Sequence, residues 1–104
     1  LGLKFNTGDM FPAKYKNQLF LVLKGAYRAP LNGHNITWVK MDANNKSIGF
    51  ETFADGWLIN TGAETTDSED GSWGRPIDVI FLKDGSMLVS DEKANAIYRI
   101  SYSQ

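Results

Sequence analysis

Short runs of apolar, β-branched and aromatic residues dominate the chain, and Gly, Pro, Asn and Asp separate them at short intervals. No stretch sustains the apolar period of a helix, so the pattern predicts strands. Residues 36–41 alternate in polarity, as in a strand with one buried face, whereas residues 18–24 are apolar almost throughout. We therefore predict an all-β fold of about seven strands: residues 1–6, 18–24, 36–41, 48–54, 77–82, 86–90 and 96–102.

Turn residues between these runs predict antiparallel pairing. Asp84-Gly85 separates two apolar runs and predicts a hairpin with a type I′ turn, because both residues tolerate positive φ. Residues 43–46 and 92–95 predict two further hairpin loops. The strands within 18–54 and within 77–102 are thus predicted to form two meanders.

The two meanders form an internal repeat of antiparallel sheets. A sheet that is apolar on both faces cannot bury both alone, and radial stacking of such units produces a β-propeller. We predict two consecutive propeller blades: residues 1–59 as one blade, 60–73 as an acidic surface loop, and 74–104 as an incomplete last blade. Two blades leave apolar flanks, which predicts a partner or further blades.

Composition excludes several classes of protein. The 104 residues suit one small domain, and Lys+Arg total 11 against 12 Asp+Glu, so the charge argues against a basic nucleic-acid binder. The absence of Cys excludes disulfide scaffolds, thiolate zinc sites and cysteine nucleophiles, and the single His excludes multi-histidine metal sites. No apolar run reaches the roughly 20 residues that a membrane-spanning helix needs.

Four motifs carry a resemblance to a known family. They are Phe11-Pro12 followed by Gly25-Ala26-Tyr27, then Gly33-His34, then Gly74-Arg75-Pro76-Ile77-Asp78-Val79, and finally the series from Lys83-Asp84-Gly85-Ser86 to Ala96-Ile97-Tyr98-Arg99-Ile100-Ser101-Tyr102. In this order they resemble the carboxyl-terminal end of the PQQ-dependent soluble sugar dehydrogenases, which act on aldoses, glucose or sorbosone. The resemblance implies a six-bladed propeller, with 1–54 as its fifth blade and 74–102 as three strands of its sixth. The outer strand of the sixth blade would then come from the far amino terminus of a complete chain.

The same resemblance implies an oxidoreductase that oxidises sugars or alcohols by hydride transfer to PQQ, with Ca²⁺ polarising the quinone. The general-base His and the calcium ligands of the family lie in earlier blades. This chain is therefore expected to hold no catalytic residue and no metal ligand, and to be inactive alone. A periplasmic or secreted location is also implied.

Two arginines are the candidate cofactor-binding residues. Arg75 lies where the family has a loop near PQQ, and its guanidinium could pair with a PQQ carboxylate; its alternative is a structural role at the start of a strand. Arg28 follows Gly25-Ala26-Tyr27 one position earlier than the family's Arg. His34 does not match the catalytic His, and we interpret it as an exposed or hydrogen-bonded turn residue.

Other polar residues receive structural interpretations. Asp78 is predicted to orient Arg75 or Arg99, and Asp91 to cap the turn that follows it. Trp38 shares a strand face with Ile36 and is predicted to lie in the core. The acids of the central loop lack the spacing of a calcium loop: Glu64, Asp67, Glu69 and Asp70.

Three functional hypotheses remain open at this point. In the first, the chain is a carboxyl-terminal part of a PQQ-dependent sugar dehydrogenase, as its start at Leu1 favours. In the second, three two-blade chains close a propeller that binds carbohydrate. In the third, the chain is an interaction module without a ligand. In the trimer, the missing outer strand would be supplied by residues 1–6 or by a swapped edge.

Overall fold

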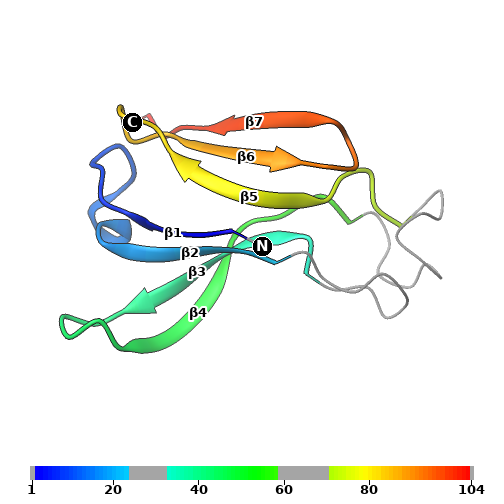
Figure 1. Cartoon of the computed structure of the whole chain (residues 1–104). Coiled ribbons are helices and arrows are strands. Elements are labelled where there is room, and N and C mark those ends of the chain that lie inside the picture. The colour runs from blue at the N-terminus through cyan, green and yellow to red at the C-terminus, as the bar shows by residue number, and fades with distance from the viewer. Residues whose placement is uncertain (1, 24–32, 59–70, 104) are drawn as a thin grey trace.

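The computed structural model describes residues 2–23, 33–58 and 71–103, and within them the chain is all-β (Figure 1). The seven predicted strands are confirmed to within two residues at each end. They are β1 (Leu3–Asn6), β2 (Gln18–Leu23), β3 (Asn35–Met41), β4 (Ser47–Ala54), β5 (Pro76–Phe81), β6 (Met87–Asp91) and β7 (Ala96–Ile100). The one helical turn in the described ranges is a 3-10 turn at Ala13–Tyr15.

The strands form two antiparallel sheets, as the repeat predicted. The first has four strands in the order β1-β2-β3-β4, and the second has three in the order β5-β6-β7. Leu3 lies opposite Leu21 in the first sheet, and Val79 lies opposite Val89 in the second. Each strand pairs with its neighbour in sequence, so short hairpin loops suffice to connect most of them.

The hairpin at Asp84-Gly85 is confirmed, but its predicted type I′ turn is wrong. Gly85 has a φ of 93°, whereas Asp84 is not among the described residues with positive φ. Leu82 N–H donates to Ser86 O at 2.8 Å, and Gly85 N–H donates to Leu82 O at 2.9 Å. This is a three-residue loop with one left-handed residue at its end, which needs positive φ at Gly85 only.

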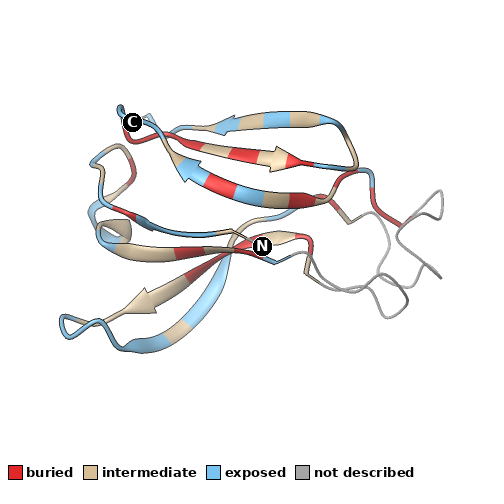
Figure 2. Cartoon of the chain, in the orientation of Figure 1, coloured by how far each residue is buried: buried red, intermediate tan, exposed pale blue. Residues whose placement is uncertain are grey.

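The core lies between the two sheets (Figure 2). Phe20 is fully buried at its centre, and its ring contacts Phe53 of the same sheet at 4.9 Å and Phe81 of the other sheet at 5.7 Å between centroids. Trp38 and Ile36 are buried on one strand face, which confirms that prediction. Alternate residues of β2, β3, β5 and β6 supply most of the core, because successive side chains of a strand point to opposite faces. Phe11 and Trp57 join the core from segments outside the strands.

The opposite faces of both sheets carry exposed apolar side chains, as predicted for unpaired flanks. On the first sheet, Leu3, Phe5 and Phe50 are exposed by 56%, 46% and 76%. On the second, Ile80 and Ile97 are exposed by 45% and 72%. Neighbouring apolar side chains with this exposure are unusual on the face of a sheet that only water covers.

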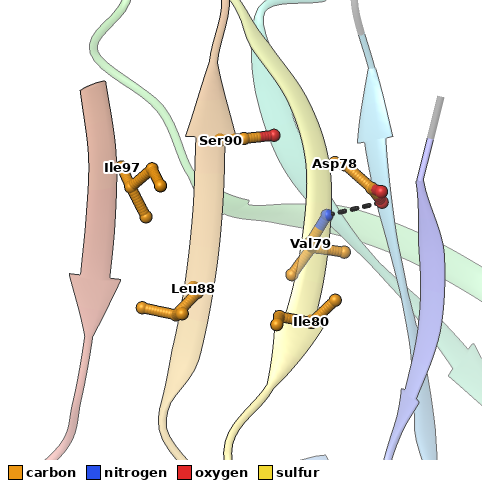
Figure 3. A pocket seen from close by; sticks show the side chains of 6 residues that line it. All are labelled: Asp78, Val79, Ile80, Leu88, Ser90 and Ile97. Carbon is orange, nitrogen blue, oxygen red and sulfur yellow. Dashed lines mark hydrogen bonds between the residues drawn. The ribbon is translucent and has the colours of Figure 1, made fainter. Parts of the chain in front are cut away.

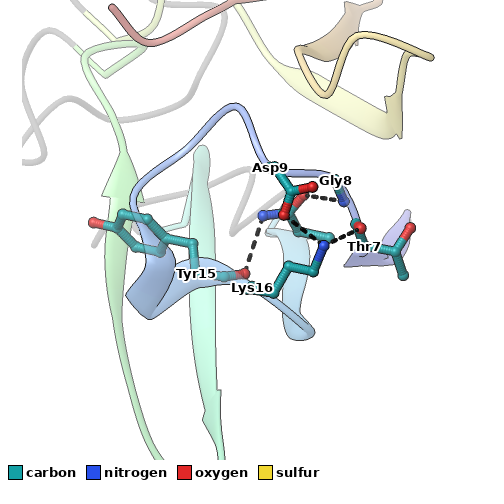
Figure 4. A network of polar contacts seen from close by, with 6 residues as sticks. Thr7, Gly8, Asp9, Tyr15 and Lys16 are labelled. Carbon is teal, nitrogen blue, oxygen red and sulfur yellow. Dashed lines mark hydrogen bonds and ion pairs between the residues drawn. The ribbon is translucent and has the colours of Figure 1, made fainter. Parts of the chain in front are cut away.

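A network of polar contacts holds the connection between β1 and β2 (Figure 4). Asn6 is fully buried; its Nδ2 donates to Tyr15 O at 3.0 Å, and its Oδ1 accepts from Gly8 N–H at 3.2 Å. Lys16 Nζ reaches Thr7 O at 2.9 Å and Asp9 Oδ1 at 2.6 Å. These bonds satisfy the polar groups of the connecting segment and place Tyr15 against the core.

Candidate functional site

The candidate cofactor residue Arg75 lies immediately before β5, beside the turn between β6 and β7. Its backbone N–H donates to Asp91 Oδ1 at 2.9 Å, and its Nη2 pairs with Glu92 Oε1 at 2.6 Å. The Arg75 side chain is 26% exposed, and its Nε is buried without a hydrogen-bond partner in the structure. Arg75 is thus engaged by the chain itself, which favours the structural alternative, while cofactor binding by Arg75 stays a prediction.

Asp91 organises this end of the second sheet. Its Oδ1 accepts hydrogen bonds from the backbone N–H groups of Arg75, Lys93 and Ala94 at 2.8–2.9 Å. Its Oδ2 accepts from the Tyr98 hydroxyl at 2.6 Å. The prediction that Asp91 caps the turn is therefore confirmed.

These hydrogen bonds change the acidity of both partners. Partial burial raises the pKa of Asp91, but the donors from Ala94, Arg75, Tyr98 and Lys93 outweigh it and leave that pKa below its ordinary value. Burial and the bond to Asp91 raise the pKa of Tyr98. Asp91 is therefore an ionised acceptor at neutral pH, suited to holding strands together and not to acid catalysis.

Two tryptophans join the Asp91–Tyr98 pair in an aromatic cluster. The Tyr98 ring lies 5.9 Å from Trp57 and 6.1 Å from Trp73 between centroids. Trp57 is buried, whereas Trp73 is 49% exposed and its Nε1 donates to Gly56 O at 2.7 Å. The sequence pattern had not placed these three rings together, because they come from separate segments.

Asp78 does not orient either arginine, so that prediction is wrong. Its Oδ1 accepts from Val79 N–H at 2.8 Å, whereas Arg99 Nη2 pairs with Asp84 Oδ2 at 2.7 Å. The reason is position: Glu92 lies beside Arg75 in the turn, and Asp84 lies beside Arg99 in the hairpin.

Of the remaining polar residues singled out from the sequence, His34 lies in the described part of the chain. His34 is buried, with 1% of its surface exposed and a φ of 51°, so the exposed alternative of its interpretation is wrong, whereas the hydrogen-bonded alternative is not contradicted. Arg28 and the acidic residues Glu64, Asp67, Glu69 and Asp70 lie outside the described residues. Across residues 2–23, 33–58 and 71–103, no group of three or more His, Cys, Asp or Glu is arranged to hold a metal.

Comparison with known proteins gives one relevant similarity. The chain is 33% identical over 106 aligned positions to a protein of Borreliella burgdorferi described as uncharacterized, and the match covers all of this chain. It covers 26% of that relative, so the chain spans about a quarter of the relative's length. No family model matches the chain, and no solved structure matches it. Among the described residues, no helix has the length and apolarity to cross a membrane.

Proposed function

We propose that the chain forms the last two blades of a six-bladed β-propeller of the PQQ-dependent sugar dehydrogenase type. Within the complete propeller it supplies structure, and catalysis belongs to the other blades. The observation that carries this proposal is the packing of two consecutive antiparallel sheets face to face, each with a second apolar face turned outward.

The arrangement of the strands supports radial stacking. β5 contacts β1 and β2, and Gly2 N–H donates to Ile77 O at 3.1 Å, so the first strands of the two sheets lie side by side. β4 and β7 lie at the far edges of the two sheets (Figure 1). Neighbouring blades of a propeller stack in this way, with their first strands nearest the axis.

The length of the Borreliella relative also supports the proposal. This chain matches 26% of that protein, so the relative is about four times as long. That length leaves room for four further blades of the size seen here. A complete propeller would cover both outer faces of this chain with apolar surface.

PQQ and Ca²⁺ do not fit the described residues by themselves. The guanidinium of Arg75 is paired with Glu92, and no metal-ligating cluster exists in the described ranges. In this proposal the calcium site, the catalytic base and the sugar substrate belong to the remaining blades, and Arg75 and Arg28 stay the candidate contacts of this chain with PQQ. Oxidation of a sugar and a periplasmic or secreted location belong to this proposal for the whole protein.

The trimer of two-blade chains is a second candidate, because both apolar faces lie on one chain. β1 is paired with β2 through its whole length. For residues 1–6 to supply an outer strand to another subunit, β1 would have to leave its own sheet. We therefore rank the trimer second.

A chimera tests the proposal. The matching segment of the Borreliella relative is replaced by this chain, and the chimera is assayed for PQQ binding and sugar oxidation with Ca²⁺. We expect a folded monomer with PQQ-dependent activity, and no activity from the 104-residue chain alone. If the chimera and the relative both fold but neither binds PQQ, the dehydrogenase assignment is refuted. Sugar oxidation by the 104-residue chain alone would refute the purely structural role of this chain.

A further inference from the structure

The outward face of the second sheet contains a shallow hollow of about 160 Å³ (Figure 3). Its lining is mostly apolar and comes from all three strands: Asp78, Val79, Ile80, Leu88, Ser90 and Ile97. Register places Asp78, Ser90 and Ile97 in one row across the sheet and Ile80 and Leu88 in the next. Arg99 continues the second row on β7, where it pairs with Asp84. The volume suits one or two apolar side chains of a partner, not a large ligand.

Asp78 is the one charged residue that lines this hollow. It lies at the edge of the second sheet nearest β1, because a Cβ atom on Gly2 would collide with Asp78 Oδ1. Its Oδ1 accepts a hydrogen bond from Val79 N–H at 2.8 Å, and no cation pairs with it in the described part of the chain. An exposed carboxylate here is tolerable only while water reaches it.

We infer that this face docks a second β-sheet that inserts apolar side chains into the hollow and presents an Arg or Lys to Asp78. Ile80 and Ile97 are exposed apolar side chains, and a partner surface that buries them also desolvates Asp78. A buried carboxylate with no cation to pair with is strongly destabilising, and the one backbone donor of Asp78 does not neutralise its charge, so we expect the partner to bring a cation. This inference rests on the proposed function, in which the partner sheet belongs to the remaining blades.

A second copy of this chain is a poorer partner. The register of the first sheet places only uncharged residues on its outward face within the described strands: Leu3, Phe5, Leu19, Leu21, Leu23, Asn35, Thr37, Val39, Phe50 and Thr52. That face is apolar enough to cover Ile97, but it has no cation for Asp78. Charge complementarity therefore favours a different sheet.

Two alkyl probes of opposite charge test the chemistry of the face. n-Octylammonium and n-octanoate are titrated separately into the isotope-labelled chain, and amide shifts are followed by NMR. We expect saturable shifts at Ile80, Leu88 and Ile97, with the cation bound about threefold to fivefold more tightly, as for an exposed ion pair. Equal affinity, tighter octanoate, or no binding of either probe would overturn the inference.

Matched variants locate the effect. Asp78→Asn should abolish the preference for the cation, and Asp78→Thr serves if the first variant does not fold. Asp9→Asn is the control, because Asp9 is an exposed acid in the connection between β1 and β2 and does not line the hollow. Loss of the preference in the control as well would assign it to overall charge and refute the role of Asp78.

The chimera tests the docking itself. Asp78→Lys should lower the melting temperature of the chimera more than it lowers the melting temperature of the isolated chain. The reason is that only the chimera has the partner sheet. Equal effects would show that nothing docks at Asp78. None of these measurements uses PQQ, so their failure and the failure of the dehydrogenase assignment are distinguishable.

Discussion

The Tyr98 hydroxyl donates to Asp91 Oδ2 at 2.6 Å, while Oδ1 of the same carboxylate accepts three backbone N–H groups. One ionised side chain thus joins the residue before β5, the turn after β6 and the middle of β7. Hydrogen bonds to a charged acceptor are stronger than neutral ones. This end of the second sheet depends on the charge of Asp91.

Acidification should therefore destabilise the chain. The pKa of Asp91 is lowered in the folded state, so its contribution is present above the ordinary carboxyl value of 3.8 and is lost as pH falls through the folded pKa. The Ser86 hydroxyl and N–H, with Arg99, lower the pKa of Asp84 from 3.8 to about 2. Protonation of Asp84 therefore adds to the loss of stability as the pH falls from 3.8 to about 2. Urea unfolding at a series of pH values should show this loss. Asp91→Asn should reduce the slope, and an unchanged slope would contradict the role of Asp91.

Gly74→Ala should be destabilising by about 1–3 kcal/mol, the usual range for overpacking. A Cβ atom there would collide with Asp91 Oδ2 and lie 2.6 Å from Trp57 Cδ1. Neither neighbour moves freely, since Asp91 is held by four donors and Trp57 is buried. Thermal unfolding measures the change. Full stability of Gly74→Ala would mean that the Asp91 turn is looser than described.

Phe20 and Phe50 should differ sharply in their effect on stability. Phe20→Ala removes a ring at the centre of the core and should be destabilising by about 3–5 kcal/mol. Phe50 is 76% exposed on the outward face, so Phe50→Ala should change the free energy of unfolding by less than about 0.5 kcal/mol. Denaturant midpoints compare the two. Similar losses would mean that Phe50 is covered in solution.

Arg75→Gln should lower the stability of the isolated chain by less than about 1 kcal/mol, because its pair with Glu92 is partly exposed. In the chimera, Arg75→Gln distinguishes the structural role of Arg75 from the cofactor-binding role. A structural Arg75 leaves PQQ affinity unchanged, whereas a cofactor-binding Arg75 weakens it. Glu92→Gln is the matched control, since it breaks the same pair and keeps the guanidinium.

Sequence pattern was sufficient for the strands and their pairing because these follow local rules. Residues 36–41 alternate in polarity and did form a strand, and Asp84-Gly85 did form a hairpin. The partners of Asp78 and Arg75 were not predictable in this way. They depend on which acids the turns bring near, and Glu92 and Asp84 lie closer to the arginines than Asp78 does. The contact of Trp57 with Tyr98 depends likewise on packing between segments far apart in sequence.

The two outward faces make a prediction about the isolated chain. Phe50 and Ile97 are exposed by 76% and 72% on opposite sheets, so the chain should associate as its concentration rises. Light scattering at two concentrations measures the molar mass. The double variant Phe50→Glu and Ile97→Glu should lower it, because charge on an apolar face opposes its burial. A single trimer at both concentrations would favour the self-assembled propeller, since two face types that meet head to tail around a ring stop at a fixed size. A molar mass that keeps rising with concentration would indicate that the two outward faces are covered by other blades in the complete protein, as the proposed function requires.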